Sequence, residues 1–472
     1  MYILALEAST TSAKAVLYDS TDASMQLRTK AFRPPGADIS LHDADSDWQD
    51  LLRLGRELAE GKDISAITLS CAWHSLLLCD KDMQPMSPVY LWTNTEASDV
   101  CAALRQDAGY TKAFYQKTGC MVNAIYPFFK LRMLAERGCD LSAFRIMGQG
   151  TYHTWRLTGQ WAVTDAVASG SGLLNIHTKA YDPALLEELG IQEAQLGRLI
   201  SYRDVLRLNE EGAKSLGLRP GIPVLASMPD GALNQVGADA MDEGVMSLSA
   251  GTSGALRFAA SRPVLPDDPG VWCYLGPDSW LSGAATSGCC NCVDWFIARI
   301  CGGHVAYAEL EKEAAEAEGD TPVFLPFLFG ERCPGWNDLR RGGFFGLKPS
   351  HARGDLYRAV LEGVLFNLYQ CFEILADLNG APSGIRLSGG ITNSPFWMQM
   401  CADIFQHNLE VDGTAHASMI GSLILACRAL GLPEDRRRTS AGSGRLIIPN
   451  PDAAGYYREK YARYLACYQA TR

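Results

Sequence analysis

The sequence has no excess of positive charge and no stretch that reads as an export signal or a membrane span. It carries 42 Lys and Arg against 53 Asp and Glu, a formal net charge of -11, which argues against a nucleic-acid-binding surface. The N-terminus reads as a strand rather than a basic segment followed by an apolar run, and no stretch approaches a membrane span. We therefore expect a cytoplasmic protein with neither nucleic-acid nor membrane partners.

Cysteine and histidine spacing typical of metal sites is also missing. The chain has 15 Cys and 8 His. Its one cysteine cluster, Cys289-Cys290-Asn291-Cys292, has no histidine or second cysteine pair at metal-binding spacing. We therefore expect buried thiols rather than a zinc site or a disulfide framework.

The length of the chain exceeds what one hydrophobic core organises. Its 472 residues, 47% hydrophobic and 20% charged, suit a globular protein of two domains, each of roughly 200 residues. We expect the domains to span residues 1–240 and 241–472. The oligomeric state stays open, a homodimer included.

Residues 227–258 are the most informative stretch. Pro229-Asp230-Gly231 opens an apolar-periodic segment, so Asp230 is predicted to be a helix N-cap. Residues 245–258 are predicted to form two strands joined by the turn Gly251-Thr252-Ser253, whose N–H groups and hydroxyls suit an anion. A carboxylate beside a phosphate-binding turn favours phosphoryl transfer.

The start of the chain repeats half of this pattern. Residues 2–6 read as a strand, residues 7–14 as a turn of small and hydroxyl residues, and residues 15–18 as the returning strand. The repetition indicates an internal duplication in which each hairpin opens a domain and the two turns face each other across a cleft. That arrangement is typical of α/β proteins with two actin-like, ribonuclease H-like ATPase domains. The alternative is a pair of ordinary hairpins, because Gly, Ser and Thr are common in turns.

Two further strand ends carry aromatic and polar side chains. A predicted strand at residues 64–70 leads to Trp73 and His74, and a second at residues 89–92 ends at Trp92. Ligands of open α/β sheets bind beyond the carboxyl ends of strands, and aromatic faces with planar polar groups suit sugars. The alternative for His74 is a satisfied structural histidine.

The later half contains a strand that runs into a double glycine. Residues 385–388 lead to Gly389-Gly390, and Ser394 is predicted to cap a helix that ends at Phe405. Such a turn lets a flat ligand approach the backbone closely, with a helix N-terminus behind it.

These motifs together resemble the FGGY family of carbohydrate kinases over essentially the whole chain, and within it the gluconate kinases. The matching segments are Asp230-Gly231-Ala232, residues 250–254, residues 330–337 with 343–347, residues 356–363, and residues 388–390 with 402–405. The resemblance implies transfer of the ATP γ-phosphate to a hydroxyl of a sugar or sugar acid.

The resemblance also implies roles for individual residues. Asp230 would be the general base and would contact the sugar, and Mg²⁺ would lie near Asp230 and Glu7 through waters. The residues that would bind ATP are Thr10, Thr11, Lys14, Gly251, Thr252, Gly389, Gly390 and Asn393, and those that would contact the sugar are Trp73, His74 and Trp92.

Several positions depart from the family pattern. Glu7 and Ser9 replace Asp and Gly, Asn94 and Glu96 replace Asp and Arg, Gly150-Thr151 replaces Lys-Asp, and Cys289-Cys290 replaces Gly-Gly. Glu96 would repel a sugar acid, so Arg332 or Lys130 is expected to compensate if gluconate, the favoured substrate, is correct. A neutral ketose or polyol such as xylulose, and a sensor that binds sugar or nucleotide without turnover, are the alternatives.

Overall fold

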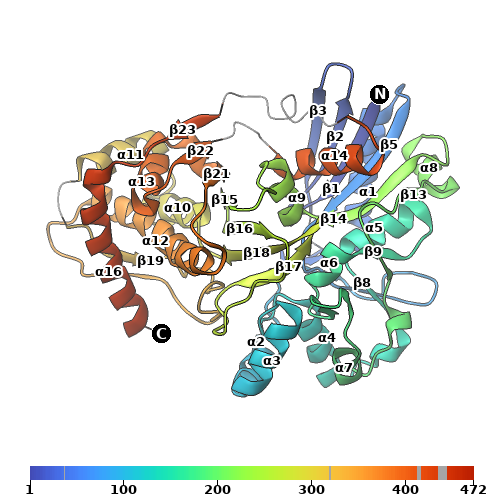
Figure 1. Cartoon of the computed structure of the whole chain (residues 1–472), viewed down its shortest axis with the longest axis horizontal. Helices are drawn as coiled ribbons and strands as arrows, with labels where there is room; N and C mark the ends of the chain where they lie inside the picture. Colours follow the sequence, from blue (N-terminus) through green and yellow to red (C-terminus); the bar gives the residue numbers. More distant parts are fainter. Residues whose placement is uncertain (34, 37, 318–319, 412–415, 434–443, 472) are drawn as a thin grey trace.

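The computed structural model describes the whole chain except residues 34, 37, 318–319, 412–415, 434–443 and 472. Two large mixed sheets dominate the described part, one from each half of the chain (Figure 1). The six strands of the first sheet are, in spatial order, β13 (Leu206–Arg207), β14 (Pro223–Pro229), β5 (Ile64–Cys71), β1 (Tyr2–Ala8), β2 (Ser12–Asp19) and β3 (Ser24–Ala31). The seven of the second are β17 (Trp272–Gly276), β18 (Ser279–Thr286), β16 (Gly254–Ala260), β15 (Val245–Ala250), β21 (Gly384–Ser388), β22 (Leu409–Val411) and β23 (Arg445–Ile447).

The two sheets share one arrangement of five strands. In the first sheet, β1–β2 and β2–β3 are antiparallel pairs, and β5 and β14 continue in parallel beside β1. In the second, β15–β16 and β16–β18 are antiparallel pairs, and β21 and β22 continue in parallel beside β15. The predicted duplication and the two-domain actin-like fold are therefore confirmed, because two ordinary hairpins would not repeat three further strands.

Helices cover both sheets and fill the connections between their strands. In the N-terminal half these are α1 (Ala44–Ala59), α2 (Ser98–Leu104), α3 (Ala108–Thr118), α4 (Pro127–Glu136), α5 (Gln149–Thr158), α6 (Asp165–Ser169), α7 (Pro183–Glu188), α8 (Glu210–Leu216) and α9 (Asp230–Gly237). In the C-terminal half they are α10 (Cys290–Trp295), α11 (Tyr307–Glu316), α12 (Arg353–Asn379), α13 (Pro395–Phe405), α14 (Ala417–Ala429) and α16 (Ala454–Ala470). The shorter strands are β4 (Leu41–His42), β6 (Leu77–Cys79), β7 (Val89–Tyr90), β8 (Arg145–Met147), β9 (Ala162–Thr164), β10 (Leu174–Asn175), β11 (Ala180–Tyr181), β12 (Arg198–Ile200), β19 (Val323–Leu325) and β20 (Gly343–Phe345).

Helix α12 corrects the expectation that no stretch approaches a membrane span. Its 27 residues are long and apolar enough to cross one, but 72% of its most apolar window is buried inside the protein. It packs against β16, β18 and β19, so its apolar character is that of a core helix enclosed by its own domain.

Of residues 98–200, helices α2, α3, α4 and α7 lie below the two sheets in Figure 1, whereas α5 packs against β14 and β5 of the N-terminal sheet. The segment contains most of the helices of the N-terminal half, with short strands between them. It is bonded to the C-terminal half: the Cys273 N–H donates to the Gly119 carbonyl at 3.1 Å, and the Tyr126 and Tyr274 hydroxyls are 2.7 Å apart. These hydrogen bonds therefore join residues 98–200 to the C-terminal half.

A pair of crossing helices joins the halves a second time. Helix α14 comes from the C-terminal half but buries Met419 and Leu423 against Ile3 and Ala5 of the N-terminal sheet. It also packs along α9 so closely that a Cβ added to Gly237 would lie 1.9 Å from the Ala417 carbonyl oxygen. Because Asp230 begins α9, this contact helps to set the position of its carboxylate.

Candidate active site

Asp230 lies where β14 ends and α9 begins, and its side chain is half-buried. The predicted N-cap role is wrong, since Pro229 occupies the cap position and no side chain caps this helix. Asp230 is instead the first helical residue, and its Oδ1 accepts from the adjacent Gly231 N–H at 2.7 Å. The carboxylate therefore does not cap the helix and can contact a bound substrate.

Burial, followed by the negative charge of Glu7, raises the pKa of Asp230 to about 6, against the opposing effects of the Gly231 N–H, Arg257 and Lys14. A carboxylate with such a pKa is ionised at pH 7 yet more basic than an exposed aspartate, which suits a general base. Lys14 belongs to the first hairpin and Arg257 to the second. Both hairpins therefore bring charge close to Asp230.

The first hairpin holds a buried ion pair. Glu7 is 1% exposed. Its Oε1 accepts from Lys14 Nζ at 2.7 Å and its Oε2 from Ser70 Oγ at 3.1 Å. The longer side chain that replaces the family's Asp thus reaches Lys14 across the hairpin.

The turn of the first hairpin is linked to the strand end that carries Trp92. Trp92 Nε1 donates to Thr10 Oγ1 at 2.8 Å, and the ring is half-buried, while the neighbouring Thr11 is exposed. The structure thereby joins a residue predicted to bind phosphate to one predicted to contact sugar.

Replacing Trp92 with phenylalanine tests this link. The Trp92→Phe variant keeps an aromatic face but loses the donor to Thr10, so we expect a loss of about 1 kcal/mol in stability. We also expect KM for both ATP and sugar to rise a few-fold. Thermal melting and initial-rate kinetics measure the two effects. A rise in KM for sugar alone would show that Trp92 acts only as a stacking surface.

The second hairpin meets the double glycine, as the nucleotide hypothesis requires. Gly389 has φ +95°, and a Cβ there would lie 2.5 Å from the Ala250 carbonyl oxygen and 2.9 Å from Gly251 N. A Cβ on Gly390 would lie 3.1 Å from Cys290 Sγ. Thr252 and Asn393 are both exposed beside this junction. Gly251, Gly389 and Gly390, all predicted to bind the nucleotide, therefore lie close together, with Cys290 beside them.

Trp73 and His74 are more buried than their predicted roles suggest. Trp73 is 6% exposed and donates from Nε1 to the Ala166 carbonyl at 3.0 Å. His74 is 7% exposed, and its Nδ1 is 2.6 Å from the Gly170 carbonyl oxygen. Because a carbonyl can only accept, Nδ1 carries the proton and Nε2 is the acceptor. Burial lowers the pKa of His74 to about 3, so the imidazole is neutral.

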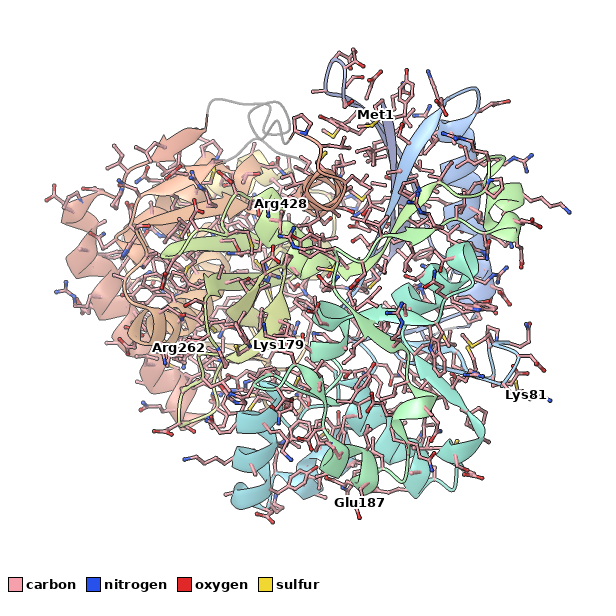
Figure 2. All side chains as sticks on the ribbon, turned by 45° about the vertical axis from the view of Figure 1, so that its right-hand side comes forward. Met1, Lys81, Lys179, Glu187, Arg262 and Arg428 are labelled. Carbon is pink, nitrogen blue, oxygen red and sulfur yellow. The ribbon has the colours of Figure 1, made fainter. Side chains whose placement is uncertain are left out.

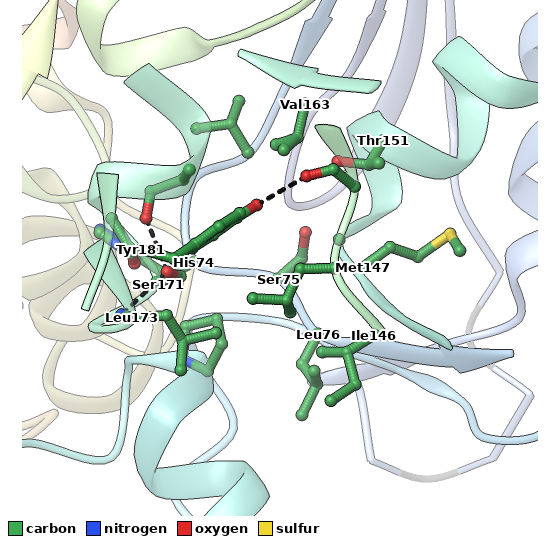
Figure 3. Close-up of a pocket in the computed structure, with 17 residues that line it drawn as sticks. His74, Ser75, Leu76, Ile146, Met147, Thr151, Val163, Ser171, Leu173 and Tyr181 are labelled. Carbon is green, nitrogen blue, oxygen red and sulfur yellow. Dashed lines mark hydrogen bonds between the residues drawn. The ribbon is translucent and has the colours of Figure 1, made fainter. Parts of the chain in front are cut away.

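A cavity of about 50 Å³ lies behind His74 (Figure 3). Most of its wall is apolar, with Leu76, Ile146 and Leu173 among its lining residues, and it does not reach Asp230 or Trp92. It has room for a few water molecules and is much smaller than the roughly 300–1,000 Å³ of typical ligand pockets. A hydroxyl bound in this cavity would lie away from the candidate base, Asp230.

Two arginines from the C-terminal half reach the same region. The Arg332 guanidinium lies 5.1 Å from the centre of the Trp92 ring, and its charge contributes to lowering the pKa of His74. Arg257 was not assigned a role from the sequence. The available signal was a charged residue inside the otherwise apolar strand Ala255-Leu256-Arg257-Phe258, since such residues are rare without a partner.

Two of the departures from the family pattern have structural explanations. Glu96 accepts from Arg137 Nη1 at 2.6 Å, so its charge is compensated and the expected repulsion of a sugar acid is reduced. A side chain at Gly150 would collide with Ser227 Oγ at 2.4 Å and Cys71 Sγ at 2.5 Å, which leaves no room there for a lysine.

Lys130, one of the two cations expected to compensate for Glu96, instead binds backbone carbonyl groups. Its Nζ donates to the carbonyls of Ala124 and Ile125 at 2.6 and 2.8 Å. The side chain is fully buried, and burial lowers its pKa to about 7. Of the two candidates, only Arg332 points its charge toward the aromatic side chains of the site.

Comparison with known proteins identifies both halves of the chain. Residues 2–237 match the N-terminal domain of the FGGY family of carbohydrate kinases, and residues 246–430 match its C-terminal domain. The chain is 27% identical to a gluconokinase of Bacillus licheniformis over 481 residues, covering 97% of this chain and 94% of that protein. It is 28% identical to a xylulose kinase of Escherichia coli (strain K12) over 389 residues, covering 79% of this chain and 78% of that protein.

Solved structures agree with the sequence relatives. The gluconate kinase from Lactobacillus acidophilus superposes with a TM-score of 0.93 at 26% identity, covering 99% of this chain and 98% of that one. A ligand-bound xylulose kinase from the same organism superposes with a TM-score of 0.94 at 26% identity and the same coverage. With both family domains in order along the chain, this protein belongs to the FGGY family of carbohydrate kinases and is an ATP-dependent sugar kinase.

Proposed function

We propose that this kinase phosphorylates a hydroxyl of a sugar acid, with gluconate as the favoured substrate and Asp230 as the general base. The observation that carries the proposal is the Asp230 carboxylate, with a pKa raised to about 6, placed between a hairpin that contains Lys14 and one that contains Arg257. A base of this kind accepts the hydroxyl proton as the oxygen attacks the γ-phosphate. Gluconokinases among the relatives with full-length similarity support the choice of acid.

We assign different roles to the two domains according to where the predicted binding residues lie. We assign residues 1–240 to sugar binding, to the first phosphate turn and to the base, and residues 241–472 to the nucleotide. Gly251, Gly389 and Gly390 share one backbone surface, which supports a nucleotide lying along it. Thr10, Thr11 and Lys14 would reach the phosphates from the opposite domain.

Mg²⁺ fits the acidic end of the site. The described residues contain no cluster of three or more His, Cys, Asp or Glu that could enclose a metal, but Glu7 and Asp230 are close enough for the charge of Glu7 to raise the pKa of Asp230. Two neighbouring carboxylates suit a hydrated Mg²⁺ that takes its other ligands from phosphates and water. When bound, the ion would neutralise phosphate charge, while Lys14 and Asp230 orient the reacting groups.

A neutral ketose is the second candidate substrate. Xylulose kinases are as similar to the chain in identity and in fold as gluconate kinases are. The wall of the site would also suit a neutral sugar, because Trp92 offers an aromatic face and His74 a neutral acceptor. Charge recognition is therefore the property that separates the two candidates.

An ADP-release assay over gluconate, other aldonates, xylulose and polyols tests the proposal. We expect gluconate to give the highest kcat/KM of the panel, with turnover that depends on Mg²⁺. Asp242→Asn is a matched control, because Asp242 is exposed and its carboxylate lies outside the site. A kcat/KM for xylulose above that for every sugar acid would overturn the substrate assignment while leaving the kinase assignment intact.

The expectations of a cytoplasmic location and of no nucleic-acid or membrane partner stay predictions, as does a homodimer. They rest on the net charge of -11 and on composition. Gel filtration with light scattering measures the oligomeric state directly.

A further inference from the structure

Arg257 places a cation in the middle of the C-terminal sheet. It lies on β16, opposite Ser247 of β15 and Gly283 of β18. Its Nε and Nη1 atoms are buried and have no hydrogen-bond partner. A buried guanidinium with unpaired N–H groups is costly, so its retention in a sheet calls for an explanation outside the fold.

The guanidinium of Arg257 faces the sugar side of the site. Its Nη2 would be 3.2 Å from a Cβ built on Gly231, and the Trp73 ring lies 3.0 Å from the same point. Arg257 therefore lies next to the candidate base, Asp230, and to the Trp73 ring. The turn Gly251-Thr252-Ser253 comes directly before β16, and Arg257 lies in the middle of that strand.

Arg332 lies in the loop between β19 and β20, with its guanidinium over the Trp92 ring. Its Nε is also buried without a hydrogen-bond partner, and its positive charge contributes to lowering the pKa of Arg257, so the two guanidinium groups are close enough to repel each other. The preceding Glu331 fixes the loop: it accepts from the Gly335 N–H at 3.0 Å, the Tyr468 hydroxyl at 2.6 Å and Arg340 Nη1 at 3.0 Å.

Among the described residues, the nearby charged groups do not accept hydrogen bonds from the unpaired N–H groups of Arg257 and Arg332. Asp230 is the carboxylate beside Arg257, but no hydrogen bond joins the two among the described residues. Asp338, which is near Arg332, accepts two bonds from Asn123 Nδ2 at 3.0 and 3.1 Å. Arg257, beside Trp73, and Arg332, beside Trp92, therefore bring positive charge and unpaired N–H groups to this part of the molecule.

We propose that Arg257 and Arg332 together bind the carboxylate of a sugar-acid substrate, with the hydroxyl to be phosphorylated directed toward Asp230. The inference rests on the proposed function and deepens it, because it names the residues that distinguish an acid from a neutral sugar. Planar guanidinium groups match a carboxylate in two-bond geometry, and the buried position of their N–H groups strengthens the interaction. A neutral ketose would leave those donors unpaired, which disfavours its binding.

The test compares gluconate with gluconamide, which has the same shape but no charge, in the full-length enzyme. For Arg257→Met and Arg332→Met we expect kcat/KM for gluconate to fall about 30- to 1,000-fold. The fall for gluconamide should be at least tenfold smaller. Arg257→Lys should recover part of the loss, because it restores charge without the two-bond geometry. Arg262→Met is the matched control, since Arg262 is exposed just beyond β16 (Figure 2).

Two results would overturn the inference while leaving the proposed function standing. One is an equal loss on gluconate and gluconamide, accompanied by loss of sugar-independent ATP hydrolysis, which would place Arg257 on the phosphoryl group. The other is unchanged gluconate kinetics in both variants. If Arg257→Met does not fold, as judged by circular dichroism, Arg257→Lys and Arg332→Met carry the comparison. A wild-type enzyme that turns over xylulose and no sugar acid would overturn both the inference and the proposed substrate.

Discussion

Replacing Asp230 with asparagine should lower kcat about 10²- to 10⁴-fold, because the reaction loses its proton acceptor. The substitution keeps the size of the side chain and the acceptor for the Gly231 N–H. Since Asp230 does not cap α9, the helix should form as before. We expect KM for sugar to change by less than about tenfold, so that the loss lies mainly in the chemical step.

The pH dependence of the wild-type enzyme provides a second measurement of the same group. A base must be unprotonated, and the pKa of Asp230 is raised to about 6, so kcat/KM should fall about tenfold for each pH unit below 6. In the Asp230→Asn variant, this fall of kcat/KM below pH 6, the acidic limb of the pH profile, should be absent. An unchanged limb in the variant would assign it to another group.

The stability of the Asp230→Asn variant has a predicted sign. The folded-state pKa, about 6, lies above the usual aspartate pKa of 3.8, so the fold favours the neutral carboxyl. The stabilising contribution of Asp230 to the free energy of unfolding is fully present below about pH 4 and is lost as the pH rises through 6. At pH 7 the variant should therefore be more stable than wild type by an amount on the order of 1 kcal/mol, with no gain at pH 4. A variant that melts much earlier than wild type at pH 7 would show that Asp230 is structural.

Replacing Gly237 with alanine should destabilise the protein by about 3 kcal/mol or more. The new Cβ would lie 1.9 Å from the Ala417 carbonyl oxygen and 2.7 Å from its carbon, both backbone atoms of α14. Backbone atoms cannot rotate away as a side chain can, so α9 and α14 would have to separate. Thermal and denaturant unfolding measure the loss.

The same substitution should also reduce activity. Gly237 and Asp230 are the two ends of α9, so a shift of the helix by about 1 Å displaces the base and can lower kcat on the order of 10²-fold. Gly455→Ala is the matched control: it lies in α16, nothing is within 4 Å of its added Cβ, and it should be neutral or slightly stabilising. Wild-type stability in Gly237→Ala would mean that the two helices are not in tight contact in solution.

The hairpins, the double-glycine turn and the capped helix after it could be predicted because their signals are local. Ser394 does accept from the Trp397 N–H at 3.0 Å, and α13 ends at Phe405 as predicted. Short-range backbone geometry limits which residues suit a turn or a cap. The motifs built on those elements were therefore sufficient to identify the family.

The partners of the charged side chains could not be predicted, because they are contributed by distant segments. Lys130 was a candidate for binding the substrate, yet its ammonium group donates to two carbonyls just before its own helix, α4. Glu96 suggested repulsion, yet Arg137 compensates its charge. Spacing along the chain does not indicate which cation will be used by a carbonyl or a carboxylate and which will be left free.

The sequence by itself determined the duplicated fold, the family, and Asp230 as the candidate base, because each depends on the type and order of residues along short segments. The tertiary structure alone decided that Asp230 stands between Lys14 and Arg257 with a raised pKa. It also decided that Arg257 and Arg332 are left with unpaired N–H groups near each other. The physical reason is that desolvation and Coulomb interactions depend on distances across the two halves of the chain, which only packing sets.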